Sequence, residues 1–179
     1  MLEKGNCCLV IVDVQGKLAQ LMFEKDKLFK NIQILIKASK ILSIPILWCQ
    51  QQPKAIGVTV PEISNLLTDE KPIDKACFSC CGCEEFNKRL AQTGAKQILL
   101  CGIEAHVCIY QTARELSACG KEVHLIADAV SSRTSENKTI AIQRMTAEGV
   151  KISSTEMALF EFIRTAEHPQ FKQIVSLIK

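Results

Sequence analysis

The chain has 179 residues, of which 47% are hydrophobic and 23% are charged, values typical of a globular protein rather than a disordered or collagen-like one. The 22 Lys and Arg residues exceed the 19 Asp and Glu residues by only three, which argues against a nucleic-acid partner. The longest apolar run, Cys7–Val12, is too short for a membrane span of about 20 residues or a secretory core of roughly 7–15. We therefore expect a single cytoplasmic domain over 1–179, with no membrane partner.

Short apolar runs rich in β-branched residues alternate along the chain with longer segments of helical period. Strands are predicted at 7–12, 44–49, 73–78, 97–101, 122–127 and 150–153. Helices are predicted at 26–42, 61–67, 84–93, 105–119, 135–148, 155–165 and 170–178. This alternation predicts a mostly parallel six-stranded sheet with helices on both faces and right-handed crossovers. The segment 50–59 is the longest irregular one, and we expect it to form a pocket wall or a lid.

Three reactive side chains fall where predicted strands end. Asp13 follows the first strand, Lys75 lies in or just after the third, and Cys108 lies beyond the fourth, in the first turn of the next helix. Ligands of open parallel sheets bind beyond the carboxyl ends of the strands, so the three would face one crevice. The helix N-terminus and Lys75 would both favour the Cys108 thiolate. Asp13 would take the proton from the Cys108 thiol and return it to a leaving group. In the alternative interpretation the three residues are unrelated: Asp13 caps a turn, Lys75 is a solvated surface lysine and Cys108 is a core thiol.

The ten cysteines do not by themselves indicate disulfides, because reduced thiols fit a chain of this size without an export signal. Four of them lie in apolar runs and are predicted core residues: Cys7, Cys8, Cys49 and Cys101. Another four form two overlapping C-x-x-C pairs: Cys77, Cys80, Cys81 and Cys83. Zinc sites usually add a second pair or histidines, so packed thiols are the favoured interpretation of this cluster, with a metal site as the alternative.

Nearly the whole chain resembles the isochorismatase-like cysteine hydrolases, and in particular the isochorismatase domain-containing branch. The matching pieces, in order, are LVIVDVQ (9–15), QQPKAIGVTVPE (51–62), DKACFSC (74–80), CGIEAHVCIYQTA (101–113) and IADAVSSR (126–133). The resemblance implies a three-layer α/β/α sandwich of Rossmann-like topology, usually assembled into homo-oligomers.

The resemblance also implies roles for particular residues. Asp13 would be the general acid/base, Lys75 its positive partner and Cys108 the nucleophile. A cis peptide would lie between Ile103 and Glu104, and the backbone N–H groups of Glu104 and Cys108 would form an oxyanion hole.

Two departures from the wider superfamily narrow the expected activity. Where nicotinamidases carry a histidine-containing metal motif after the second strand, this chain has no histidine between Trp48 and Gln52. We therefore expect no metal and no cofactor. Vinyl-ether-cleaving isochorismatases lack a nucleophilic cysteine, so Cys108 favours attack on a carbonyl carbon.

The sequence thus predicts a hydrolase that cleaves a small amide-like or related carbonyl substrate through a thioester. The alternative is a catalytically silent module that binds a metabolite or a protein with the same pocket. Pocket-wall residues are expected at Trp48, Gln51 and Phe78. His106 lies two residues before Cys108, a spacing that turns the two side chains to different sides of a helix.

Overall fold

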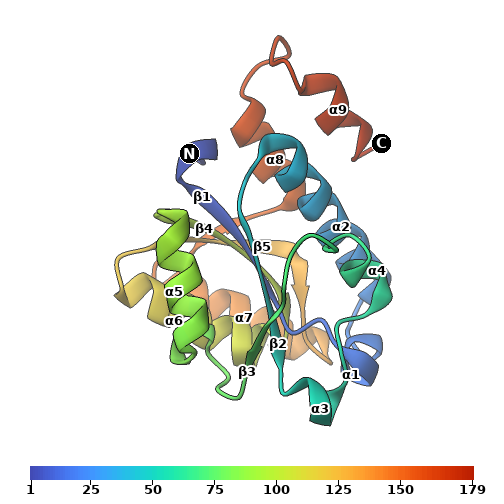
Figure 1. The fold of residues 1–179 in the computed structure, drawn as a ribbon, viewed down its shortest axis with the longest axis vertical. Coiled ribbons are helices and arrows are strands. Elements are labelled where there is room, and N and C mark those ends of the chain that lie inside the picture. Colours follow the sequence, from blue (N-terminus) through green and yellow to red (C-terminus); the bar gives the residue numbers. More distant parts are fainter.

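The computed structural model describes residues 1–179 as three layers with one sheet in the middle (Figure 1). All neighbouring strands pair in parallel, in the order β3-β2-β1-β4-β5-β6. The strands are β1 (Cys7–Val12), β2 (Ile46–Gln51), β3 (Ile73–Lys75), β4 (Gln97–Ile103), β5 (Glu122–Ser131) and β6 (Lys151–Ser153). The predicted six-stranded α/β sandwich is confirmed, and its order reverses between β1 and β4, where Rossmann-like sheets bind ligands.

Helices cover both faces of the sheet (Figure 1). One face carries α2 (Lys25–Leu42), α4 (Pro61–Ser64), α8 (Thr155–Ile163) and α9 (Phe171–Ser176). The other carries α5 (Glu84–Thr93), α6 (Tyr110–Ala118) and α7 (Ser135–Ala147). Two short helices, α1 (Gly16–Gln20) and α3 (Pro53–Ile56), follow β1 and β2 at the carboxyl ends of the strands. None of the helices combines the length and apolar character needed to cross a membrane.

The alternation of side chains along β1 divides the hydrophobic core into two clusters. Cys7, Leu9 and Ile11 point to the α2 side, whereas Cys8 and Val10 point to the α5 and α6 side. Every residue of β1 is buried, as expected for a central strand covered on both faces. The cysteines predicted to be core residues are buried in these clusters.

All ten cysteines are free thiols. In the 77–83 segment Cys80 is fully buried, and its backbone N–H donates to Thr112 Oγ1 of α6 at 2.9 Å. Nowhere in the chain do three or more His, Cys, Asp or Glu side chains gather in a way that could hold a metal ion.

The structure differs from the sequence prediction mainly at element ends. The third strand stops at Lys75 instead of continuing to residue 78, because the carbonyls of Cys77 and Phe78 turn to accept from the Lys75 ammonium. The fifth strand runs on to Ser131. The helix predicted over 105–119 is divided into a π-helical turn, η3 (Ala105–Ile109), and α6. The two short helices α1 and α3 were not predicted, since one turn is too short to show a helical period.

Candidate active site

A buried ion pair joins the ends of β1 and β3. Lys75 Nζ lies 2.7 Å from Asp13 Oδ2, although the two residues are 62 positions apart in the chain. Their side chains are 0% and 3% exposed. Asp13 follows β1 with a positive φ of 56°, a left-handed conformation that a non-glycine residue rarely adopts. The parallel strands therefore bring this carboxylate and this ammonium together at one edge of the sheet.

Polar atoms surround the Lys75 ammonium. Besides Asp13 it approaches Gln51 Oε1 at 2.8 Å, the Phe78 carbonyl at 3.1 Å and the Cys77 carbonyl at 3.2 Å. Burial alone would lower the pKa of Lys75, but its electrostatic surroundings, chiefly the Asp13 carboxylate, outweigh burial and hold that pKa above its ordinary value. Lys75 is therefore a fixed positive charge, and its three N–H donors are engaged by the protein itself.

The Asp13 carboxylate has one engaged oxygen and one free oxygen. Oδ2 accepts from Lys75, whereas Oδ1 is buried and accepts no hydrogen bond. Burial raises the pKa of Asp13 above its ordinary value, and Lys75 opposes part of that shift. A carboxylate with a free oxygen and a raised pKa is well suited to take up and release a proton.

Cys108 lies in the π-helical turn η3, is 7% exposed, and lines the same pocket as Asp13. Burial raises the pKa of the Cys108 thiol, the Asp13 charge raises it further, and Lys75 lowers it only in part. The expected low thiol pKa is therefore wrong. Burial in an apolar wall and the adjacent carboxylate outweigh Lys75, and α6 begins only at Tyr110, two residues beyond Cys108. In the resting site the sulfur is a thiol.

The loop that carries Cys108 has two unusual backbone features. The peptide between Ile103 and Glu104 is cis, at the position that the family resemblance implies. Just before it, Gly102 has φ +118°, and a Cβ at this position would lie 2.1 Å from the Val12 carbonyl oxygen. Only glycine lets β4 pass β1 this closely at Val12, the residue before Asp13. The turn then closes through the Glu104 carbonyl, which accepts from the N–H groups of Val107 and Ile109.

The thiol and the carboxylate face a small, mainly apolar pocket of about 190 Å³. It is lined by Asp13, Leu18, Gln51, Ile56, Phe78, Ile103, Glu104, Val107 and Cys108. Gln51 and Phe78 thus occupy the wall where the sequence predicted them. The sequence prediction missed Leu18 and Ile56, which lie in α1 and α3. The rule that loops after parallel strands build the site would have pointed to both.

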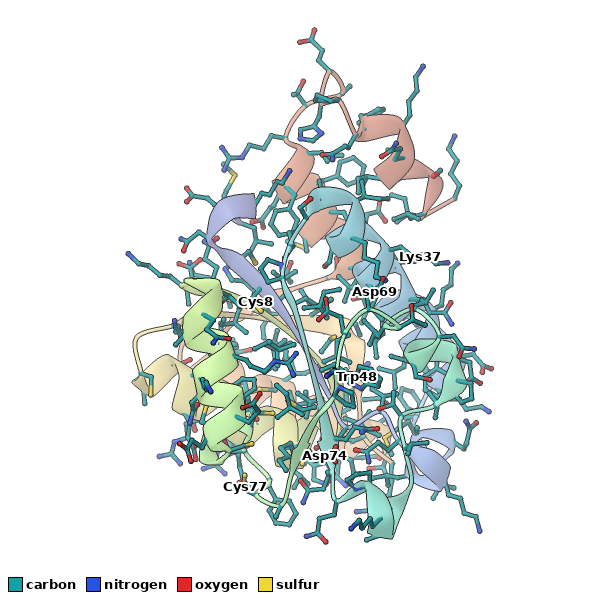
Figure 2. The ribbon with its side chains drawn as sticks, viewed as in Figure 1. Cys8, Lys37, Trp48, Asp69, Asp74 and Cys77 are labelled. Atoms are coloured by element: carbon teal, nitrogen blue, oxygen red, sulfur yellow. The ribbon has the colours of Figure 1, made fainter.

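Trp48 does not line this pocket, so its prediction as a wall residue is wrong. Successive strand residues point to opposite faces of a sheet, and Trp48 and Gln51 are three positions apart on β2. Trp48 therefore packs into the core on the α2 side, where its Nε1 donates to Thr59 Oγ1 at 2.8 Å. Figure 2 shows Trp48 in the interior of the molecule, away from Cys77 near the end of β3.

Two buried glutamines fix the pocket wall that carries Ile56. The Gln15 amide accepts from the Gln51 N–H at 2.6 Å and donates to the Gly57 carbonyl at 2.6 Å. Gln50 Oε1 accepts from the Thr59 N–H at 2.8 Å. The segment 50–59, expected as a pocket wall or a lid, is thus a wall tied at both ends to the sheet.

The far side of the pocket is tied to the end of β5. Glu104 Oε1 accepts from Arg133 Nε at 2.9 Å, and His106 Nδ1 lies 2.9 Å from Ser132 Oγ. The hydrogen-bond partner of His106 is therefore Ser132 and not Cys108.

Comparisons with known proteins agree with this fold. Residues 7–157 match the model of the isochorismatase domain. The chain is 38% identical over 176 residues to isochorismatase domain-containing protein 2 of Danio rerio, which covers 98% of this chain and 87% of that protein.

Two solved structures are similar over nearly their whole length. The MAR1 ribonuclease of Caenorhabditis elegans has a TM-score of 0.93 at 34% identity, covering 99% of this chain and 91% of the other. The YcaC gene product of Escherichia coli, described as an octameric hydrolase of unknown specificity, has a TM-score of 0.88 at 22% identity, covering 98% and 94%. With a family model matched over most of its length and a relative 38% identical, the chain belongs to the isochorismatase family.

Proposed function

We propose that this protein is a cofactor-free hydrolase of small amide-like or related carbonyl compounds, in which Cys108, Asp13 and Lys75 form a catalytic triad. The observation that carries this proposal is the shared pocket: a thiol and a carboxylate with a free oxygen line a cavity of about 190 Å³. A buried ammonium 2.7 Å from that carboxylate holds it in place.

The first half-reaction forms a thioester. Asp13 Oδ1 accepts the Cys108 proton while the sulfur adds to the substrate carbonyl carbon. The carbonyl oxygen becomes an oxyanion, which the backbone N–H groups of Glu104 and Cys108 stabilise. The C–N bond then breaks, and Asp13 returns the proton to the departing nitrogen, so that a neutral amine leaves.

The second half-reaction regenerates the site. Asp13, again a carboxylate, accepts a proton from a water molecule while the water oxygen adds to the thioester carbon. The C–S bond breaks, a carboxylic acid leaves, and Asp13 returns the proton to the Cys108 sulfur. Atoms and charges balance without a metal, an oxidant or a cofactor.

Lys75 serves this cycle as a positioning residue with a permanent charge. Because its pKa is raised, it keeps its charge at neutral pH, and it lowers the pKa of the buried Asp13 below what burial alone would impose. It therefore keeps the carboxylate ionised before each proton uptake.

Two other functions are alternatives to this hydrolase. The structural relative from Caenorhabditis elegans is described as a ribonuclease. In this chain, however, the pocket is mainly apolar and offers a phosphodiester no free cation, because Lys75 is paired with Asp13 and Arg133 with Glu104. The other alternative is a catalytically silent module that binds a small molecule or a protein in the same pocket.

The test is a panel of small uncharged primary amides, assayed by ammonia release. Wild-type protein should hydrolyse at least one of them, and Cys108→Ala should lower the rate by several orders of magnitude while remaining folded. The matched control is Cys119→Ala, since Cys119 is exposed and outside the pocket. Full activity in Cys108→Ala would refute the triad. Amide binding without ammonia release would support the silent module, and cleavage of an RNA oligomer that requires Cys108 would support the ribonuclease.

We also propose that the protein assembles into a homo-oligomer. Several large apolar side chains are exposed in the single chain, among them Leu21 at 64% and Val58 at 67%. Exposed apolar side chains of this size are common at subunit interfaces. Light scattering on the purified protein should give a mass of at least twice the 19.9 kDa of one chain. The mass of a single chain would refute the assembly.

A further inference from the structure

We propose that Glu104 makes the pocket selective for charge, so that it admits uncharged or cationic amides and rejects substrates that carry a carboxylate. This inference rests on the proposed function for its biological meaning. The charge of the pocket is nevertheless measurable at Cys108 whether or not any amide is hydrolysed.

The pocket contains two acids and no available base. Asp13 and Glu104 both line it, whereas Lys75 and Arg133 do not. The Lys75 ammonium is buried and is engaged by Asp13, Gln51 and two backbone carbonyls. Because Lys75 offsets the charge of Asp13, a substrate carboxylate would meet chiefly the Glu104 carboxylate, without a free cation to pair with.

The charge of Glu104 is only partly offset by Arg133. Its side chain is 11% exposed, and Oε1 accepts from Arg133 Nε at 2.9 Å. The Arg133 side chain is 56% exposed, so water screens its guanidinium. The remaining walls, including Leu18, Ile56 and Val107, are apolar and strengthen the field of Glu104 inside the pocket.

The proposed reaction requires the negative charge of Asp13 but not that of Glu104. The Asp13 charge is required for proton transfer, so it is present in any enzyme that uses this triad. Glu104 contributes its backbone N–H to the proposed oxyanion hole, and its side chain takes no part in the proton transfers. Its carboxylate is therefore the residue that sets the charge preference of this particular chain.

Two alkylating reagents of nearly the same shape measure this preference. Iodoacetamide is neutral and iodoacetate is anionic, and both transfer their CH₂ carbon to a thiolate with loss of iodide. The ratio of their rates at Cys108, measured by peptide mass spectrometry, is divided by the same ratio at the exposed Cys119. In the wild-type protein we expect Cys108 to prefer iodoacetamide more strongly than Cys119 does.

The deciding variant is Glu104→Gln, which keeps the shape and removes the charge. It should lower the normalised preference at Cys108 by on the order of tenfold, the effect of one charge acting through a partly screened pocket. An unchanged preference in Glu104→Gln, or no preference in the wild-type protein, would overturn the proposal.

Arg133→Gln is the matched control for damage to the loop. It removes the partner of Glu104 but leaves the carboxylate, so the preference for iodoacetamide should stay the same or increase. A preference lost equally in both variants would mean that the 104–133 contact acts only by holding the loop, and would overturn the proposal. If the amide screen fails while the alkylation result holds, the triad hydrolase is wrong and the charge selectivity stands.

Discussion

Replacing Lys75 by methionine tests the buried ion pair most severely. The substitution preserves most of the side-chain volume but removes the ammonium that lies 2.7 Å from Asp13 Oδ2. Asp13 would then be a buried carboxylate without a cation, and three further oxygen acceptors would lose their donor. Removing one partner of a buried pair costs about 3–5 kcal/mol of stability. In a chain of this length that lowers the melting temperature by roughly 10 °C.

The assay is urea unfolding at pH 7, with the double variant Asp13→Asn/Lys75→Met and an exposed pair as controls. The double variant removes both charges, so it should recover much of the stability lost in Lys75→Met. Lys40→Met breaks the exposed pair with Asp69, whose atoms are 3.4 Å apart, and should cost at most about 1 kcal/mol. A loss below about 1 kcal/mol in Lys75→Met would refute the reasoning, because the pair would then behave like a surface contact.

Because the Asp13 charge raises the pKa of Cys108, Asp13→Asn should shift the pH profile of Cys108 alkylation by iodoacetamide to lower pH, and an unchanged profile would show that the two groups do not interact. Gly102→Ala places a Cβ 2.1 Å from the Val12 carbonyl oxygen and should destabilise the protein by about 3 kcal/mol or more. Its control, Gly149→Ala, has φ +87° but open space and should cost about 1–2 kcal/mol in the same urea assay; equal losses would refute the close-approach argument. Hydrogen bonds from Lys151 and His124 lower the pKa of Glu122 to about 2, so its stabilising contribution is present above pH 4.5 and is lost as the pH falls toward 2. Glu122→Gln should therefore flatten the dependence of the urea midpoint on pH between 2 and 4.5, whereas a slope equal to that of wild type would contradict this assignment.

The sheet could be predicted from the sequence because its strands are short apolar runs ended by polar residues. Cys7–Val12 is buried on both faces and ends at Asp13, so both the strand and the residue at its carboxyl end followed from the pattern. Strand ends that depend on distant side chains could not be predicted. β3 leaves the sheet after Lys75 because the carbonyls of Cys77 and Phe78 turn toward the Lys75 ammonium. The charge partner of that ammonium, Asp13, lies 62 residues earlier in the chain.

For the site, the residue positions were predictable but their electrostatics were not. Position at strand ends brought Asp13, Lys75 and Cys108 to one edge of the sheet, and the family resemblance suggested their roles. The raised pKa of the Cys108 thiol arises from burial against residues of other elements, which the sequence does not reveal. Trp48 was misplaced because its orientation depends on the register of β2, and the strand runs to Gln51 rather than ending at residue 49.

The most direct test of the central claim is to trap the intermediate on the protein. Wild-type protein is mixed with an amide that it hydrolyses, quenched in acid within one turnover, and digested for peptide mass spectrometry. We predict the mass of the substrate acyl group on Cys108 and none on the other nine cysteines, with no acylation in Asp13→Asn. An acyl group on a different residue, or turnover without any acylated Cys108, would contradict the account.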